Sequence, residues 1–378
     1  MKGSVRKRGK KWYYYFDLGI VDGKRKRVER VGGNTKKEAE KALREAMSEF
    51  DDTGSYIDES DITFCDYLDY WYDNYVELNC KENTKQGYTV VIRKHLKPYF
   101  KNVKLKDISP SMIQNFVNEK FKEGYSKNYL ADIAGVISSS LMYALYPLQL
   151  IKDNPYKYIK LPKYNSVKEE VKIITKEQFK IIIDRFPKGN LYHIPLLIGY
   201  YTGMRAGEVC ALTWDDIDLN KKTISINKTM IRNSKSEYLL DTPKTKTSNR
   251  TIEIGDTLVS ILKEHKIYQK EMKLKLGEFY LDKDYPAPNM VCTSKNGTYT
   301  KHKILFSTLN RVSKKELNFT FTFHMLRHTH ATLLMQHNVN PIEIQKRLGH
   351  ANIRVTLDTY SHSTKESARA VAQIFDSI

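Results

Sequence analysis

The chain has 378 residues, of which 40% are hydrophobic and 28% are charged, so it can bury a sizeable core and does not belong to the disordered class. Its formal net charge of +19 indicates a polyanionic partner, and nucleic acid is the commonest one. The four cysteines form no CxxC pair, which excludes a zinc ribbon or a thioredoxin-type motif, and no apolar run reaches the ~18 residues of a membrane span. Scattered thiols fit a reducing compartment, so we expect a cytoplasmic protein.

Residues 1–50 predict a small α+β unit. The runs "KWYYYFDLGI" and "KRKRVERVGG" have strand character and are separated by Asp22-Gly23, a strong hairpin signal, and "GSVRKRG" can add a third strand. Asn34 or Thr35 can then cap a helix. The apolar residues that fall near one face of this helix are Ala39, Leu43, Met47 and Phe50.

Basic charge is densest in this first segment, residues 1–50, which holds 15 Lys and Arg against 7 Asp and Glu. A sheet face rich in Lys, Arg and Tyr suits a nucleic-acid groove, whereas a solvated basic hairpin is the structural alternative. The charge density favours DNA contact. The acidic stretch 51–61 is interpreted as a linker.

Residues 62–160 predict a compact helical domain. Two of the predicted helices begin with a capping residue, Thr63 or Ser109, and the other two begin near Thr84 and Ser126. Pro98 is expected to stop or bend the second helix. The segment 152–163 is expected to leave the domain as an extended chain, and residues 171–378 then form a third, mixed domain.

The stretch "YYTGMRAGEVCALTW" breaks an apolar helix at Thr202-Gly203 and begins another helix near Arg205. An arginine at the start of a buried helix is costly unless it is paired. Arg205 either forms a structural pair with Glu208, or it is held rigid so that two of its N–H groups can grip a phosphate.

The stretch "EYLLDTPKTKTSNRTIEI" contains two strand-like runs around a polar turn that carries Lys244, Lys246 and Arg250. The turn is either simply solvated, or it is a flexible hairpin that brings one ammonium group to a leaving oxygen.

In "TFHMLRHTHATLLMQ", His324 and Arg327 share a helical face, and His324 and His328 have a spacing that is also found in zinc sites. Metalloprotease chemistry needs a glutamate directly after the first histidine, where this chain has Met325, and no cysteine lies nearby. We therefore predict no metal site here.

The stretch "LGHANIRVTLDTYSH" follows a helix that Asn340-Pro341 begins and Gly349 ends. His350 comes directly after that glycine. Tyr360, ten residues further, is either the last apolar residue of a core stripe or a nucleophile.

In chain order these stretches supply Arg, Lys, His-x-x-Arg, His and Tyr. The motifs "TGMRAGEV", "PKTKTSNRTI", "HMLRHTHAT", "LGH" and "TYSH" together resemble those of the tyrosine recombinase (phage-type integrase) family. The segments "HLKPYFKNVKLKDIS" and "DNPYKYIKLP" are similar to that family's core-binding domain, and "GSVRKRGKKWYYYF" resembles the arm-binding domain of integrases from conjugative transposons and related phages. The resemblance implies as catalytic residues Arg205, Lys246, His324, Arg327, His350 and the nucleophile Tyr360, with Lys244 as an alternative to Lys246.

The resemblance also implies a multidomain, mainly α protein with small β-sheets. We expect an α+β arm-type DNA-binding domain at 1–55, a helical core-binding domain at 61–160, and a mixed α/β but mostly helical catalytic domain at 171–378. The catalytic domain is expected to end in a tail helix, "STKESARAVAQIFDSI", whose apolar stripe packs either on its own domain or on a neighbouring subunit.

The function implied is that of a site-specific DNA recombinase, which cleaves and rejoins DNA through a 3′-phosphotyrosyl intermediate and a Holliday junction to integrate and excise a mobile genetic element. The expected partners are double-stranded DNA, at core and arm sites, and further copies of the chain in a homotetramer on DNA. An excisionase or a host DNA-bending protein is a candidate accessory factor. No cofactor, metal or membrane partner is expected, and the expected location is the bacterial cytoplasm, on DNA.

Three alternatives stay open at this point. A type IB-like topoisomerase shares the tyrosine chemistry, but the basic N-terminal unit and the C-terminal tail argue against it. A catalytically silent DNA-binding regulator would not need the full set of polar residues. A chromosome-dimer resolvase lacks an arm-binding domain, so the first 50 residues argue against that function.

Overall fold

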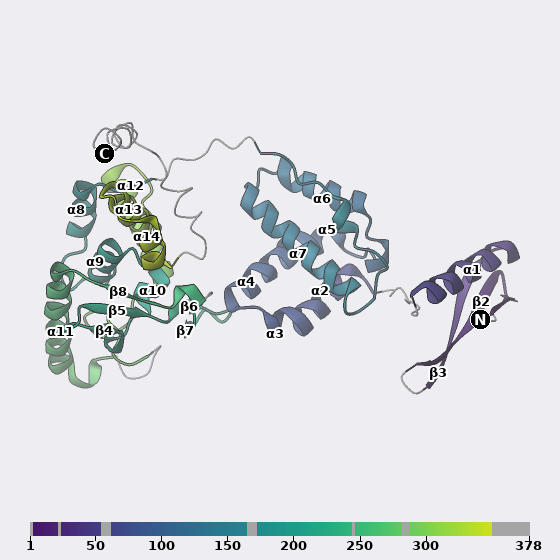
Figure 1. Cartoon of the computed structure of the whole chain (residues 1–378), viewed down its shortest axis with the longest axis horizontal. Coiled ribbons are helices and arrows are strands. Elements are labelled where there is room, and N and C mark those ends of the chain that lie inside the picture. The colour runs from purple at the N-terminus through teal and green to yellow at the C-terminus, as the bar shows by residue number, and fades with distance from the viewer. Residues whose placement is uncertain are drawn as a thin grey trace, which may run out of the picture. The chain divides into compact units, whose positions relative to one another are not determined.

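The structure is a computed structural model that describes residues 3–21, 24–53, 62–164, 172–243, 246–281 and 287–349. The chain divides into two units, Met1–Asn165 and Ser166–Ile378, and each is described by itself. The fold is mainly helical with small antiparallel sheets, as predicted (Figure 1). Within the described residues, no helix is both long and apolar enough to cross a membrane.

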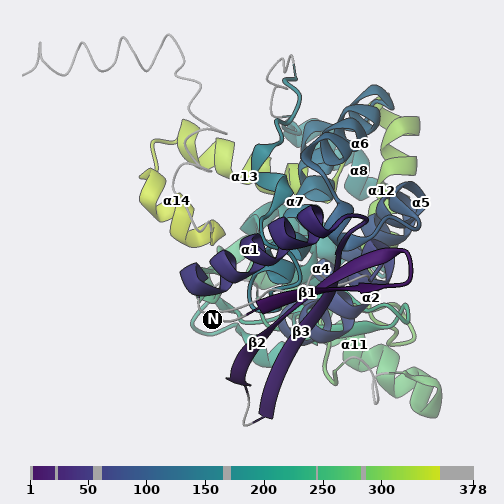
Figure 2. The same ribbon diagram turned by 90° about the vertical axis from the view of Figure 1, so that its right-hand side faces the viewer.

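The first unit begins with a three-stranded antiparallel sheet that one helix covers (Figure 2). Its elements are β1 (Gly3–Arg8), β2 (Lys11–Val21), β3 (Lys24–Gly33) and α1 (Lys36–Thr53). Successive strand residues point to opposite faces, so Tyr14 and Phe16 are buried under α1 while Tyr13 and Tyr15 face outward. Inward-facing Val28 completes this face, and the helix contributes Ala39, Leu43 and Ala46.

The predicted strands and helix of this segment are confirmed. Thr35 is a capping residue, because its Oγ1 accepts from the Glu38 N–H at 3.2 Å and Glu38 accepts from the Thr35 N–H in return. The expected turn residues Asp22 and Gly23 lie outside the described residues. The predicted linker at 51–61 is wrong at its start, because α1 continues through Thr53.

The second part of the first unit is helical. Its elements are α2 (Phe64–Trp71), η1 (Tyr72–Val76), α3 (Glu77–Asn79), α4 (Glu82–Val91), η2 (Ile92–Leu96), α5 (Lys97–Phe100), η3 (Leu105–Asp107), α6 (Pro110–Lys122), α7 (Lys127–Leu145) and η4 (Pro155–Tyr158). The side chains of Thr63 and Ser109 cap α2 and α6 as predicted, and the side chain of Ser126 caps α7, at the approximate start predicted for that helix. Apolar residues at helical spacing form the core, with Phe64, Leu68, Trp71, Phe116 and Ile137 fully buried.

Pro98 does not stop its helix, contrary to one of the two predicted outcomes. The chain stays helical through Phe100 and turns at Lys101, which has a φ of 40°. The π-helical turn η2 precedes the proline, and in it the Lys97 N–H donates to Ile92 O. This wider turn accommodates a residue that has no N–H to donate. The segment 152–163 is also less extended than predicted, because η4 interrupts it.

The second unit combines helices with two small sheets (Figure 1). Its helices are α8 (Lys176–Asp184), α9 (His193–Thr202), α10 (Ala206–Cys210), η5 (Trp214–Asp216), η6 (Lys246–Ser248), α11 (Asp256–Leu276), η7 (Gly277–Phe279), α12 (His302–Leu317), α13 (Phe323–Gln336) and α14 (Pro341–Leu348). Its strands are β4 (Ile217–Asp218), β5 (Thr223–Ile226), β6 (Thr229–Arg232), β7 (Tyr238–Asp241) and β8 (Arg250–Glu253). The apolar helix α9 lies in the core and contacts α10 and α13, so these helices share one buried centre.

The strands around the lysine turn do not form the predicted hairpin. β7 pairs with β6 in a two-stranded sheet, whereas β8 pairs with β5 in the sheet β4-β5-β8. Each strand finds its partner elsewhere because β6 directly precedes β7 in the chain, while Ile252 of β8 is buried opposite Ile224 of β5. The segment between β7 and β8, residues 242–249, carries Lys244 and Lys246 and is called the lysine segment. It connects the two sheets.

Candidate active site

The site begins where α9 ends. Gly203 has a φ of 67°, in the left-handed region, and a Cβ at this position would lie 2.8 Å from Leu348 Cδ2 and 2.9 Å from His330 Cδ2. The chain reverses here, and Arg205 becomes the residue directly before α10. The predicted helix break and restart are therefore confirmed. Gly203 also allows α14 and α13 to pack closely on this turn.

Hydrogen bonds hold the backbone and the guanidinium group of Arg205 in place, but its side chain remains accessible to solvent. Its Nη1 donates to Glu208 Oε1 at 2.9 Å, and its backbone N–H donates to Glu208 Oε2 at 3.0 Å. Its Nη2 donates to Gly349 O at 3.3 Å. The side chain of Arg205 is still 40% exposed. The structural pair with Glu208 therefore exists, and it holds an exposed guanidinium rigid rather than excluding it from function.

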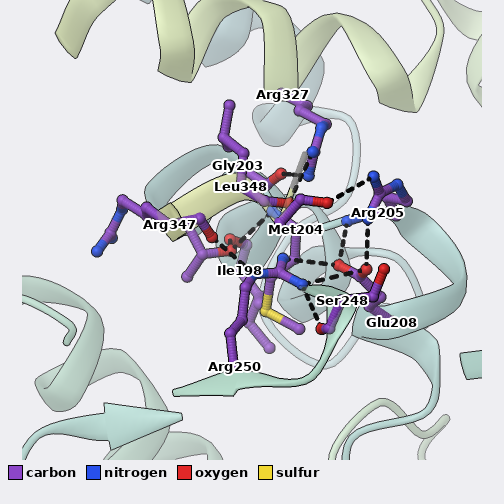
Figure 3. Close-up of polar contacts among 12 residues, drawn as sticks. Ile198, Gly203, Met204, Arg205, Glu208, Ser248, Arg250, Arg327, Arg347 and Leu348 are labelled. Carbon is purple, nitrogen blue, oxygen red and sulfur yellow. Dashed lines mark hydrogen bonds and ion pairs between the residues drawn. The ribbon is translucent and has the colours of Figure 1, made fainter. Parts of the chain in front are cut away.

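Glu208 joins two arginines (Figure 3). Its side chain is only 3% exposed, and its Oε2 accepts both from Arg250 Nη2 at 2.9 Å and from the backbone N–H of Arg205 at 3.0 Å. Burial alone would raise the pKa of Glu208, but the hydrogen bonds and charges of Arg250 and Arg205 outweigh burial and hold this pKa below its usual range. A buried, ionised carboxylate thus balances part of the positive charge that the arginines bring together.

Arg327 comes from α13 and is almost completely buried, with 1% of its surface exposed. Its Nη1 donates to Gly203 O at 3.0 Å, and its Nη2 donates to Leu348 O at 2.7 Å. Those two carbonyls lie at the C-terminal ends of α9 and α14, where helices leave backbone acceptors without intrahelical partners. Arg327 therefore joins the ends of two helices while placing its positive charge next to the Arg205 turn (Figure 3).

Arg250 is a member of this cluster that the sequence did not single out as a site residue. Its Nε donates to Arg347 O at 2.6 Å, its Nη1 to Ser248 O at 3.0 Å, and both terminal nitrogens contact Glu208. Only its position four residues after Lys246 could have drawn attention to it. Arg347, on α14, adds a further contact, because its Nε donates to His330 Nε2 at 3.0 Å.

His324 lies on an exposed side of α13, and its ring centre is 4.6 Å from that of His328. The protein atoms packed around its ring disfavour the imidazolium form, and the charges of His328, Arg327 and Arg205 act in the same direction, which lowers the pKa of His324 to about 4. The imidazole is thus neutral at pH 7.

The remaining predicted residues are described only in part. Lys246 begins the short helix η6, and nothing further is described of its side chain. Lys244, His350 and Tyr360 lie outside the described residues, as does the predicted tail stripe Val371, Ile374, Phe375 and Ile378. Within the described ranges, no group of three or more His, Cys, Asp or Glu side chains is arranged to hold a metal ion.

The cluster concentrates positive charge within the second unit. Arg205, Arg250 and Arg327 come from three separate elements, and one buried carboxylate offsets them. Fixed guanidinium groups of this kind can hold a phosphate oxygen and stabilise charge that develops on it.

Three family models match the chain. The model of the Phage integrase family matches residues 172–367, the model of the phage integrase N-terminal SAM-like domain matches residues 63–121, and the model of the Arm DNA-binding domain matches residues 4–50.

The chain is also similar to individual proteins over most of its length. A protein named Tyrosine recombinase XerC-like, from Caldanaerobacter subterraneus subsp. tengcongensis, is 30% identical over 366 residues, which cover 91% of this chain and 90% of the relative. The ICEBs1 integrase of Bacillus subtilis is 27% identical over 305 residues, which cover 80% of each protein.

Solved structures share the fold. The integrase of the Tn1549 transposon, in complex with a circular intermediate DNA, superimposes with a TM-score of 0.67 at 22% identity, covering 83% of this chain and 99% of that chain. A lambda integrase dimer bound to a COC′ core site superimposes with a TM-score of 0.56 at 17% identity, covering 96% of each chain.

Proposed function

The chain belongs to the phage integrase family of tyrosine recombinases, and from this premise we propose that it is the integrase of a conjugative mobile element, which cuts and rejoins DNA through Tyr360. The observation that carries the proposal is the arginine cluster. Arg205 is held rigid but exposed, and it lies beside the buried Arg327 at the ends of two helices. Such a fixed pair suits the non-bridging oxygens of one phosphodiester.

The proposed cleavage step is a transesterification. The Tyr360 oxygen forms a bond to phosphorus, the bond from phosphorus to the 5′ oxygen breaks, and a 3′-phosphotyrosyl ester remains. Arg205 and Arg327 offset the negative charge that builds up on the phosphate oxygens. Lys246 supplies the proton that the leaving 5′ oxygen needs, and His350 hydrogen-bonds the phosphate.

We assign to His324 the role of accepting the proton from the attacking phenol of Tyr360. A phenol has a pKa near ~10 and attacks poorly unless a group accepts its proton. The pKa of His324 is lowered to about 4, so its ring is neutral at pH 7 but only weakly basic. This role therefore requires the negative charge of the bound phosphate, which favours the imidazolium form, to raise this pKa when DNA binds. Resealing reverses these steps with a 5′-hydroxyl of a second strand, and because the ester bond energy is conserved, it requires no nucleotide hydrolysis.

We assign the DNA contacts to three domains. Residues 1–55 bind arm sites, residues 61–160 bind core sites, and residues 171–378 carry out catalysis. For the arm sites, the outward face of the first sheet supplies Tyr15, with Arg27 Cζ 4.0 Å and Arg6 Cζ 5.8 Å from its ring centre. Guanidinium groups next to aromatic rings on a basic sheet suit a DNA groove. Four copies, arranged on paired sites, would exchange strands through a Holliday junction.

The central experiment traps the covalent intermediate. The full chain is incubated with a duplex that spans the junction between the element and its chromosome and that has a nick close to the cleavage site. Cleavage releases the short fragment between the cut and the nick. This fragment carries the 5′-hydroxyl, so the strand cannot be resealed once the fragment has dissociated. The wild type is expected to form a DNA adduct that survives denaturing electrophoresis. Tyr360→Phe keeps the ring and should bind the duplex normally without forming an adduct, so an adduct from this variant rejects Tyr360 as the nucleophile.

The lysine assignment has its own test. Lys246→Ala and Lys244→Ala are compared on a normal duplex and on a duplex with sulfur in place of the 5′ bridging oxygen. Sulfur leaves without a proton donor, so the variant that lost the catalytic lysine recovers cleavage on the sulfur duplex. If Lys244→Ala recovers and Lys246→Ala is unimpaired on both duplexes, Lys244 replaces Lys246.

An assay with supercoiled plasmids distinguishes the proposed integrase from two alternatives, a type IB-like topoisomerase and a catalytically silent regulator. A topoisomerase relaxes a plasmid without a cognate site, whereas an integrase requires the site and joins two sites. A silent regulator binds the site and forms no adduct. Recombination between two plasmid-borne sites is the expected result.

A further inference from the structure

We propose that Arg250 is a positioning residue that holds the lysine segment against Arg205 and against the C-terminal end of α14. The inference rests on the proposed function, because it concerns how the parts of that active site are brought together. The role assigned to Arg250 is to hold other groups in place rather than to react.

The hydrogen bonds of Arg250 reach three separate parts of the second unit (Figure 3). Nη1 donates to Ser248 O at 3.0 Å, which fixes the end of η6, the turn that begins at Lys246. Nη2 donates to Glu208 Oε2 at 2.9 Å, the carboxylate that also holds Arg205. The third bond goes from Nε to the carbonyl oxygen of Arg347 in the last turn of α14.

The end of α14 lies directly against the lysine segment. Gly349 has a φ of 67°, and a Cβ built on it would lie 3.0 Å from Arg250 Nη1 and 3.2 Å from Thr247 O. His350 is the next residue in the chain. The left-handed glycine therefore brings the backbone before His350 onto the turn that carries Lys246, and Arg250 bonds both sides of this contact.

Only an arginine has the shape for these contacts. Its planar head presents five N–H donors in fixed directions, whereas lysine has one nitrogen and glutamine one amide group. The side chain is 7% exposed and its acceptor Glu208 is 3% exposed, so water does not compete well for these bonds. Since β7 and β8 belong to different sheets, no hairpin holds the lysine segment, and Arg250 supplies the fixed point at its C-terminal side.

A purely structural ion pair is the competing explanation, and the two differ in what the loss of Arg250 changes. If Arg250 positions the lysine, its loss impairs leaving-group protonation more than phosphate binding or folding. If it only stabilises the domain, DNA cleavage falls together with the fraction of folded protein, whatever the leaving group.

The experiment measures single-turnover cleavage by the full chain on the nicked duplex with a 5′ bridging oxygen or sulfur. Arg250→Lys keeps a cation beside Glu208, and Arg250→Gln keeps an amide donor there while Arg205 stays paired with Glu208, so at least one variant is expected to fold. Arg250→Lys should cleave the oxygen duplex at least ~100-fold more slowly than the wild type, since small displacements of catalytic groups have effects of this size. On the sulfur duplex it should recover most of that loss, with duplex affinity unchanged.

Lys228→Gln is the matched control, because it breaks another pair with a buried carboxylate in the same unit. Lys228 Nζ lies 2.8 Å from Asp216 Oδ2, and the side chain of Asp216 is 4% exposed. This control should lose stability but cleave both duplexes at the rate of the wild type once folded protein is counted.

Three results would overturn the inference. They are cleavage of the oxygen duplex by a folded Arg250→Lys variant at the wild-type rate, an equal loss on both duplexes, and a loss that the Lys228→Gln control shares. Failure of the proposed function is distinguishable, because then the wild type itself forms no adduct on either duplex.

Discussion

At the scale of single residues, the two arginines assigned to the phosphate differ strongly in solvent exposure. Arg205 is 40% exposed and Arg327 only 1%, although both are assigned to the same phosphate. Glu208 explains part of this arrangement, since it fixes Arg205 from behind and leaves the outer part of its guanidinium accessible. The two arginines should therefore respond differently to the same substitution.

Arg205→Lys and Arg327→Lys should both cut cleavage by at least ~100-fold, because a lysine keeps the charge but loses the planar two-point contact. Only Arg327→Lys should also lower thermal stability, since Arg327 bonds two helix-end carbonyls and one ammonium group does not reproduce that geometry. Adduct formation and thermal unfolding of both variants are measured side by side. A folded variant that cleaves at the normal rate removes that arginine from the site.

Glu208→Gln should destabilise the second unit at neutral pH by about 3–5 kcal/mol, because it leaves Arg250 buried without its counter-ion. The pKa of Glu208 is lowered in the folded state, so its stabilising effect is present above the pKa of the unfolded chain and is lost as the pH falls through the folded-state pKa. The difference between wild type and variant should therefore shrink towards acid pH. This difference in the free energy of unfolding is measured between pH 7 and pH 3 by urea denaturation with pulse proteolysis, in which the fragment from the second unit is followed. A difference that grows towards acid pH would contradict this account.

At the scale of elements, the site is built where helices end. The carbonyl groups at the C-terminal ends of α9 and α14 accept from Arg327, and both helices end in a left-handed glycine, Gly203 and Gly349, each with a φ of 67°. A helix end presents carbonyl groups without partners, so it attracts cationic side chains. The arginines are gathered partly because these helix ends need donors.

Gly349→Ala should lower cleavage more than it lowers stability. The left-handed backbone costs an alanine about 1 kcal/mol or more, and the added methyl group would press on Arg250 Nη1 and Thr247 O. Gly277→Ala is the control for backbone strain, because Gly277 also has a positive φ, of 51°, but a Cβ there would meet nothing within 4 Å. Its ψ of -120° lies outside the left-handed region of Gly349, so an alanine is strained at Gly277 as well. Cleavage per folded molecule, measured for both variants, should fall only for Gly349→Ala, and an equal effect in both would show that backbone strain alone is responsible.

At the scale of the whole molecule, basic charge is distributed over parts that have cores of their own. The first sheet carries its own small core, formed by Tyr14, Phe16, Val28, Leu43 and Ala46, so it does not depend on the core of the helical part that follows it. A net charge of +19 on the full chain predicts binding that depends strongly on salt.

Deleting residues 1–55 should leave cleavage at core sites intact and abolish binding to arm sites. On DNA that carries both kinds of site, the affinity of the intact chain should fall more steeply with salt than that of the truncated chain, because each neutralised phosphate adds about 0.9 to the slope of log affinity against log salt. Fluorescence anisotropy over a salt series measures both slopes. Equal slopes would mean that the basic N-terminal sheet does not contact this DNA.

The sequence by itself determined the elements and the family. Capping residues such as Thr63, Ser109 and Asn340, and apolar residues at helical spacing, are local signals, and they predicted helix starts that the structure confirms. The motif around Arg205 and the order of polar residues after it pointed to tyrosine recombinases. The helix starts could be predicted because each depends on residues that are close in the chain, and the family could be predicted because short motifs occur in a fixed order along it.

Only the tertiary structure decided which side chains hold the site together. Arg250 and Arg347 lie 97 residues apart, and the contact between them forms because β8 pairs with β5 rather than with β7. Strand pairing between distant segments depends on burial in three dimensions, so the sequence could not decide whether these two runs pair with each other, and the structure pairs each with a different strand. The roles of Arg250 as a fixed point and of Glu208 as a shared counter-ion follow from that packing, and no local pattern of residues encodes them.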